Sequence, residues 1–238
     1  MTNYKDILNR DFYYLDFESN KNGDLFLLGL EHNKSFTCYV INEDLSFLCD
    51  NQDYKENFNI QFEHPKPLIT NLLKSIQDKN GVIVAYSIAE LNLIQSIVSK
   101  EKLPDLDYLN LARAVRSWKN KFHKEAYEKL PKFRKYSNSF IAKKNSLASM
   151  MRLLPTKKQA PSDYAPGKTT SRINHIIKGF KVKKEFSKLT PVQKAKATKV
   201  LKHNHYDVTI LSVLLEEIIK KDPSRLQKAI YKLKDIKT

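Results

Sequence analysis

The sequence contains little cysteine and no long hydrophobic run. Cys38 and Cys49 are its only cysteines, they do not have metal-ligand spacing, and we expect two reduced thiols rather than a disulfide. No apolar stretch approaches the roughly 18 residues of a membrane span, and the first residues lack the basic-then-apolar pattern of a signal peptide. No internal repeat is present either. These absences predict a cytoplasmic protein without a membrane-spanning segment.

The composition is that of a globular protein. With 238 residues, of which 41% are hydrophobic, the chain is long enough to bury a substantial core. We expect one domain, or one domain that carries an insertion.

Charge is distributed unequally along the chain. Residues 1–110 contain 10 Lys or Arg and 17 Asp or Glu, whereas residues 111–238 contain 32 and 9, so the two parts carry −7 and +23. A strongly basic half favours nucleic acid as the partner, because each neutralised phosphate releases counterions and adds sequence-independent affinity. The alternative for any single lysine run, such as residues 181–184, is a solvated helix face.

Apolar periodicity predicts an α/β fold. Three strand-like runs separated by short polar turns predict an antiparallel meander over residues 12–18, 24–30 and 35–41. The next segments predict a helix, a strand buried on both faces and a second helix, over residues 65–77, 81–86 and 89–98. The order β-β-β-α-β-α is that of a ribonuclease H-like core, in which parallel strands and flanking helices join the meander.

The chain then divides into three parts. Residues 1–115 are expected to form the N-terminal part of the core, and residues 191–238 the C-terminal helices that complete it. Residues 116–190 are expected to form a basic, largely helical insertion, with a loop at residues 159–167 where proline and glycine gather.

Two acidic residues end the first strand-like run. Because strand side chains alternate between faces, Asp16 and Glu18 share one face with Tyr14, whereas Leu15 and Phe17 occupy the other. Adjacent carboxylates repel unless a cation bridges them, so this pair indicates a divalent-metal site. The alternative is that the strand ends at Asp16 and both acids reach solvent.

A third acid follows the buried strand. Glu90 stands in the first turn of the next helix, at the edge of the sheet where α/β sites are built. It also completes a capping box with Ser87, so its role can be limited to satisfying a backbone N–H.

A fourth acid and a histidine lie on the apolar stripe of a C-terminal helix. Val200, His203, Asp207, Leu211, Leu214 and Ile218 are spaced as one helical face. An unpaired buried carboxylate is costly, so Asp207 needs a metal or a basic partner. His203 is either a histidine at the core edge or a residue that orients water or the leaving group.

Together these segments resemble the motifs of the DEDD exonuclease superfamily, the ribonuclease H-like 3′–5′ nucleases. Residues 16–18 resemble its first motif, and residues 86–90 resemble the second motif of bacterial branches that have Glu there. Residues 203–208 are similar to the third motif, Y-N-x-x-D-V, with His203 in the place of the Tyr. Residues 107–113 look like the D-T-x-x-L-A-R segment that often follows the second motif, and we expect Asp107 to cap a helix there.

The resemblance implies two-metal hydrolysis of phosphodiester bonds in DNA or RNA. Two Mg²⁺ or Mn²⁺ ions would be held by Asp16, Glu18, Glu90 and Asp207, where they activate water and stabilise the leaving oxygen. His203 is a further candidate catalytic residue, although it stands four residues before Asp207 rather than the usual five.

Basic residues of the insertion are candidates for the nucleic-acid groove. We expect phosphate contacts from Lys119, Lys121, Lys124, Lys132, Arg134 and Lys135. Two other functions remain open: a non-catalytic nucleic-acid-binding protein on a decayed nuclease fold, and an endonuclease on the same core.

Overall fold

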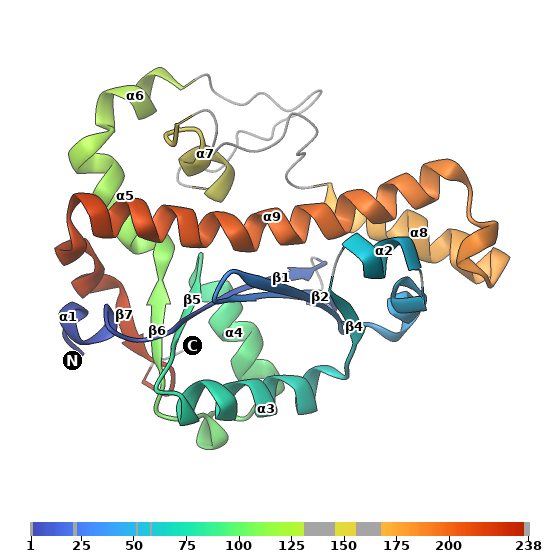
Figure 1. Cartoon of the computed structure of the whole chain (residues 1–238), viewed down its shortest axis with the longest axis horizontal. Helices are drawn as coiled ribbons and strands as arrows, with labels where there is room; N and C mark the ends of the chain where they lie inside the picture. Colours follow the sequence, from blue (N-terminus) through green and yellow to red (C-terminus); the bar gives the residue numbers. More distant parts are fainter. Residues whose placement is uncertain are drawn as a thin grey trace.

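The protein is an α/β molecule built on one mixed sheet (Figure 1). Its computed structural model describes residues 2–20, 23–50, 52–57, 59–130, 146–155 and 168–235. The sheet has seven strands in the order β4-β3-β2-β1-β5-β6-β7. Strand β1 is central, so a side chain on its upper or lower face is covered by helices.

The first three strands form the predicted antiparallel meander. They are β1 (Phe12–Ser19), β2 (Leu25–His32) and β3 (Ser35–Val40). A two-residue turn joins β2 to β3, and its residues Asn33 and Lys34 have φ angles of 51° and 63°. Positive φ at both positions is what a type I′ turn requires, and this turn matches the twist of the strands it connects.

Parallel pairing extends the sheet beyond the meander. Strand β5 (Val82–Ala85) pairs parallel with β1, and β6 (Asp107–Asn110) pairs parallel with β5. Two short strands form the edges, β4 (Ile60–Phe62) parallel to β3 and β7 (Ile230–Lys232) antiparallel to β6. The strand predicted over residues 81–86 is therefore confirmed, whereas no sequence pattern indicated the two edge strands.

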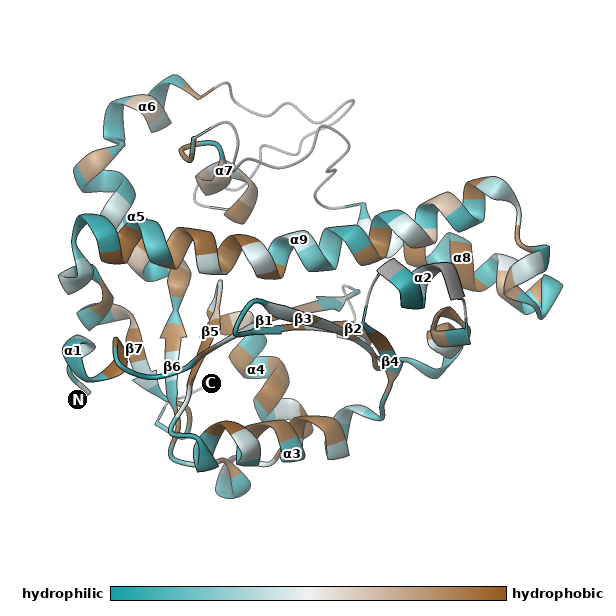
Figure 2. Cartoon of the chain, in the orientation of Figure 1, coloured by the Kyte–Doolittle hydropathy of each residue, from teal (hydrophilic) through white to brown (hydrophobic). Residues whose placement is uncertain are grey.

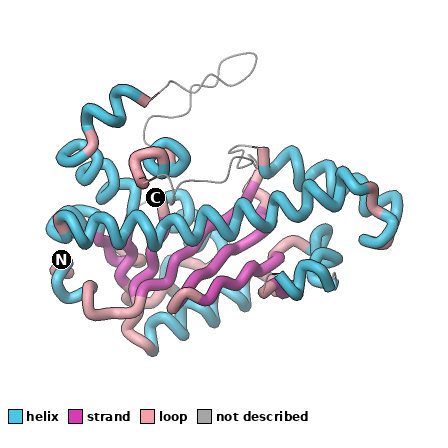
Figure 3. Tube along the Cα trace, turned by 45° about the horizontal axis from the view of Figure 1, so that its top comes forward, coloured by secondary structure: helices cyan, strands magenta, loops and turns pink. Residues whose placement is uncertain are grey.

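Helices cover both faces of the sheet (Figure 3). On one face α3 (Pro65–Asp78) and α4 (Ile88–Ile97) pack on Tyr13, Leu15 and Phe17 of β1. On the other face α5 (Leu111–Phe122) and the long helix α9 (Pro191–Lys221) pack on Val82 and Val84. Both helices predicted on either side of β5 are present, within one residue of the expected bounds.

Shorter elements complete the described chain. The remaining helices are α1 (Tyr4–Ile7), α2 (Gln52–Asn57), α6 (Lys124–Lys129), α7 (Leu147–Met151) and α8 (Thr169–Lys183). The 3₁₀ turns are η1 (Glu43–Asp50), η2 (Lys100–Lys102), η4 (Phe186–Lys188) and η5 (Pro223–Ala229). Within the described part of the chain, no helix combines the length and apolar character needed to cross a membrane. Both cysteines are buried and unbridged, as expected.

A third apolar cluster joins α8 to the meander. Ile173 and Ile176 of α8 and Val200 and Leu201 of α9 are buried together with Val40 of β3. Helix α8 runs beside the N-terminal half of α9 (Figure 1). The basic segment before α9 is therefore packed on the sheet through its apolar face.

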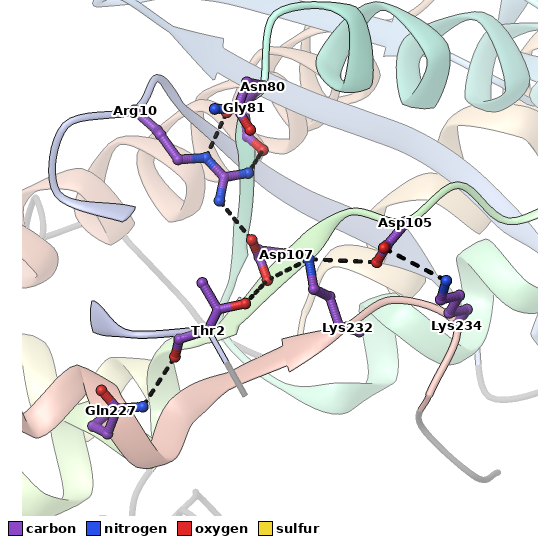
Figure 4. A network of polar contacts seen from close by, with 9 residues as sticks. All are labelled: Thr2, Arg10, Asn80, Gly81, Asp105, Asp107, Gln227, Lys232 and Lys234. Carbon is purple, nitrogen blue, oxygen red and sulfur yellow. Dashed lines mark hydrogen bonds and ion pairs between the residues drawn. The ribbon is translucent and has the colours of Figure 1, made fainter. Parts of the chain in front are cut away.

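The expected role of Asp107 as a helix cap is wrong. This residue is 2% exposed in β6, where its carboxylate accepts hydrogen bonds from Arg10 and Thr2 at 2.5 and 2.7 Å and lies 3.2 Å from Lys232 Nζ (Figure 4). The cap of α5 is Asn110, whose side chain accepts a hydrogen bond from the backbone N–H of Arg113. Strand pairing with β5 extends through Asn110, so the helix starts later than the aspartate suggested.

Helix α5 is continuous across the expected boundary at residue 115. Ala114 and Val115 on one side and Trp118 on the other are buried in the same cluster. The first turns after the boundary are thus part of the central core.

Candidate functional site

Strand β1 presents two carboxylates to the face that α9 covers. Burial alternates along the strand, with Tyr13, Leu15 and Phe17 in the cluster beneath α3 and α4. Asp16 and Glu18 point to the opposite face because adjacent strand residues alternate. The prediction that these two acids share one face of the strand, opposite Leu15 and Phe17, is confirmed.

Helix α9 brings a histidine and a third carboxylate to the same place. His203 Nε2 lies 3.3 Å from Asp207 Oδ2 and 3.7 Å from Glu18 Oε1. One ligand-type atom from each of Glu18, His203 and Asp207 lies within 4.8 Å of the others. The three side chains are 13%, 7% and 13% exposed, so they meet in a largely water-excluded setting.

Asp16 adjoins this cluster and is held by Asn204, which stands at the Asn of the Y-N-x-x-D-V motif but was not predicted as a site residue. Asn204 Nδ2 donates to both the backbone oxygen and Oδ2 of Asp16, at 3.4 Å each. Asn204 is fully buried on the apolar stripe of α9. A buried amide in that stripe is the signal that could have identified it, because a polar group there requires a hydrogen-bonding partner.

Glu90 forms the capping box that its spacing predicted. Its Oε2 accepts hydrogen bonds from the backbone N–H and the hydroxyl of Ser87, at 3.0 and 2.8 Å. Its charge nevertheless acts on Asp16 and raises the pKa of that residue. Glu90 therefore caps α4 and also lies within electrostatic range of the carboxylates on β1.

The site concentrates negative charge in a buried place. Burial raises the pKa of Asp16 well above its ordinary value, and the neighbouring charges of Asp207, Glu18 and Glu90 raise it further. Burial, followed by the charge of Asp207, raises the pKa of Glu18 to about 8. A cation would reverse both effects, because it favours the ionised carboxylates.

His203 is held neutral in these surroundings. Burial, followed by the charge of Arg172, lowers its pKa to about 4. Neutral imidazole is the form that binds a metal or accepts a proton.

Arg172 was not predicted as a site residue. It lies in the first turn of α8, which is attached to the sheet where Thr170 Oγ1 donates to the backbone oxygen of Ser19 at 3.3 Å. Ser19 directly follows Glu18, and the charge of Arg172 opposes the rise in the pKa of Glu18. No local sequence signal could have placed this arginine, because its position depends on the packing of α8 against β1.

The donor set is compatible with divalent metal ions. Glu18 Oε1 is buried and has no hydrogen-bond partner among the described residues, which leaves an acceptor directed at the cluster. Carboxylate oxygens are the ligands that Mg²⁺ and Mn²⁺ prefer. The residues present therefore fit the ions that the sequence resemblance implies.

Of the residues predicted to bind phosphate, Lys119 and Lys121 lie on α5 and Lys124 lies on α6. Lys119 is 8% exposed with its ammonium 4.1 Å from the centre of the Tyr127 ring, and Lys121 pairs with Asp222 at 2.9 Å. Lys124 is exposed at the start of α6. Lys132, Arg134 and Lys135 are outside the described residues. Phosphate binding by this group stays a prediction.

Comparison of the chain with models of known protein families and with curated proteins finds no match.

Proposed function

We propose that the protein is a metal-dependent nuclease that hydrolyses phosphodiester bonds of DNA or RNA, as a 3′–5′ exonuclease. The observation that carries this proposal is the meeting of Glu18 on β1 with His203 and Asp207 on α9. Such a concentration of buried acceptors fits bound cations better than it fits a purely structural role.

The topology of the sheet supports the same proposal. An antiparallel meander followed by parallel strands β5 and β6 is the arrangement expected of a ribonuclease H-like core. The acids of the first two sequence motifs stand on β1 and just after β5, which are adjacent strands. The acid of the third motif, Asp207, lies near Glu18 of the first motif and comes from α9, the helix that crosses this face.

Four carboxylates would hold the metal ions, those of Asp16, Glu18, Glu90 and Asp207. When bound, Mg²⁺ or Mn²⁺ would supply a lowered pKa for water and stabilisation of charge on the phosphate oxygens. Asn204 would orient Asp16 through its hydrogen bond to Oδ2. His203 would hold or transfer a proton at Nε2, beside the carboxylates of Glu18 and Asp207.

A cleavage assay on four substrates tests the proposal. End-labelled and circular forms of DNA and RNA are incubated with Mg²⁺, Mn²⁺ or EDTA, and the wild type is compared with Asp16→Asn and Asp207→Asn. We expect metal-dependent cleavage from a 3′ end, and a loss of at least about 100-fold in both variants, since even residues that only support metal ligands contribute about 10 to 100-fold.

The matched control is Asp78→Asn. Asp78 is exposed at the end of α3, on the opposite face of the sheet, so this variant should cleave like the wild type. Cleavage of the circular substrates would show that the protein is an endonuclease rather than an exonuclease. Binding without cleavage by the wild type, in either metal, would favour a non-catalytic nucleic-acid-binding protein.

A further inference from the structure

The segment that comprises α8 and the start of α9 is the most basic part of the described chain. We call residues 168–202 the basic arm; it comprises α8, η4 and the first turns of α9. The arm contains eleven lysines and arginines and one acidic residue, Glu185. In Figure 2, hydrophilic residues recur along α8 and the adjoining half of α9.

Little of this charge is neutralised. Lys181 pairs with Asp44 at 3.0 Å and Lys188 with Glu185 at 2.6 Å, and both pairs are exposed. Among the described residues, no ion pair is formed by the other basic side chains of the arm, which are Lys168, Arg172, Lys178, Lys183, Lys184, Lys194, Lys196, Lys199 and Lys202. The arm therefore presents a large positive charge, of which Glu185 and Asp44 neutralise only a small part.

The charges are held on a packed scaffold. Ala197, Val200 and Leu201 of α9 are buried with Ile173 and Ile176 of α8 against the meander. The rings of Phe180 in α8 and Phe47 in η1 also stack, with centroids 3.8 Å apart. A solvated lysine face needs no such placement, whereas a binding surface gains affinity when its charges are already positioned.

Some basic residues of the arm lie close to the carboxylates. Lys199 and Lys202 are exposed on α9, and Lys199 stands four residues, about one turn, before His203. Lys202 stands four residues before Tyr206, which adjoins Asp207 in sequence. Arg172 approaches the same site in the first turn of α8, which is attached to β1 where Thr170 Oγ1 donates to the backbone oxygen of Ser19, the residue after Glu18.

We propose that the basic arm binds the phosphate backbone of a nucleic acid and directs it to the carboxylates, with Arg172 contacting the phosphates nearest the site. This inference rests on the proposed function, and it assigns phosphate binding to α8 and α9 rather than to α5 and α6. Lysines that neutralise phosphates release condensed counterions, so the binding is independent of sequence and weakens with salt. The same charge alone would suit an anionic membrane, but the adjacent metal-type site favours a phosphodiester partner.

Binding of a fluorescein-labelled single-stranded oligonucleotide tests the arm. Fluorescence polarisation is measured in EDTA, to prevent cleavage, at several salt concentrations for the wild type and for the double variant Lys199→Gln/Lys202→Gln. Each phosphate contact on a single strand contributes about 0.7 to the slope of log K against log salt, so the slope should fall by about 1.4. At about 0.1 M salt this corresponds to roughly 25-fold weaker binding.

The matched control is Lys66→Gln/Lys74→Gln. These two lysines are exposed on α3, across the sheet from the arm, and their loss should leave both affinity and slope unchanged. Equal affinity and slope for the arm variant and this control would overturn the inference while leaving metal-dependent cleavage, and thus the proposed function, intact. Binding of anionic vesicles but not of the oligonucleotide by the wild type would also overturn it.

Arg172 has a separate readout. With Mg²⁺ present, Arg172→Gln should lower kcat/KM for a short oligonucleotide, and Arg172→Lys should restore part of the loss because it returns the positive charge. If the wild type cleaves and Arg172→Gln has the same kcat/KM, Arg172 does not contact the phosphates.

Discussion

The side chain of Asn204 on α9 occupies space that a Cβ on Gly29 of β2 would need. A Cβ at Gly29 would lie 2.6 Å from Asn204 Oδ1 and 2.6 Å from Val208 Cγ2. Gly29 is also the cross-strand neighbour of Asp16. The missing side chain therefore lets α9 approach the sheet at the level of the carboxylates.

Gly29→Ala should reduce both stability and cleavage. The added methyl group must displace Asn204 or the stiff side chain of Val208, at a cost of about 1 to 3 kcal/mol. Urea unfolding gives the stability, and the cleavage assay gives the activity at a temperature where the variant is folded. Asp107→Asn, which is destabilised in β6 and leaves the residues of the candidate site unchanged, should keep its activity. Equal losses of activity in the two variants would show that reduced stability alone is responsible.

Asn204→Ala should weaken metal binding more than folding. The variant removes the hydrogen bond to Asp16 Oδ2, and residues that orient metal ligands typically contribute about 10 to 100-fold in metal affinity or activity. Calorimetric titration with Mn²⁺ measures the affinity. Asn71→Ala on the exposed side of α3 is the control. An unchanged Mn²⁺ affinity in Asn204→Ala would contradict a positioning role for Asn204.

Glu18→Gln should stabilise the metal-free protein and abolish its response to metal. A neutral amide avoids both the cost of burying a carboxylate and its repulsion with Asp207, the two causes that raise the pKa of Glu18 to about 8. The wild type should in contrast gain about 2.7 kcal/mol at a Mn²⁺ concentration 100 times its Kd. Thermal unfolding with Mn²⁺ and with EDTA measures both effects. If the metal-free Glu18→Gln variant is less stable than the metal-free wild type, the carboxylate of Glu18 does not destabilise the metal-free fold.

Asp107→Asn should destabilise the fold in a pH-dependent way. Burial alone would raise the pKa of Asp107, but hydrogen bonds from Arg10, Thr2 and Lys232 lower it below its ordinary value. Because the pKa is lower in the folded state, the stabilisation is present above the unfolded pKa, near 3.9, and is lost as pH falls through the folded pKa. Removing one partner of a buried pair costs about 3 to 5 kcal/mol.

Urea unfolding from pH 7 to pH 3 measures this difference. The gap between the wild type and Asp107→Asn should be constant between about pH 7 and pH 5 and should narrow below about pH 4. Asp105→Asn is the matched control, since Asp105 pairs with the same Lys232 but is 52% exposed (Figure 4). Its effect should be no more than about 1 kcal/mol. A gap that persists at pH 3 would contradict the ionised pair.

The parts of the fold that depend on local pattern were predictable. The alternation of Leu15, Asp16, Phe17 and Glu18 placed the carboxylates on the correct face of β1. The Ser87 and Glu90 spacing predicted a capping box that is present. In both cases the deciding interactions lie within a few residues of each other.

The parts of the fold that depend on contacts between residues distant in the sequence were not predictable. Asp107 resembled a helix cap because its partners, Arg10 and Lys232, come from opposite ends of the chain. The edge strands β4 and β7 are each three residues long, too short for an alternating pattern to be recognised. Arg172 and Asn204 belong to the candidate site only because α8 and α9 pack on β1.

Because α9 is continuous, it fixes the distance between the basic arm and the carboxylates. One uninterrupted helix of 31 residues carries Lys199 in its first half and Asp207 near its centre. At about 1.5 Å per residue, these positions lie about 12 Å apart along the axis, which equals roughly three to four nucleotides at the 3.4 Å spacing of a B-form strand. If the proposed function and the proposed role of the basic arm are correct, helix geometry would set the number of nucleotides between the phosphate contact and the cleaved bond, and residues inserted between the two positions would change that number in steps.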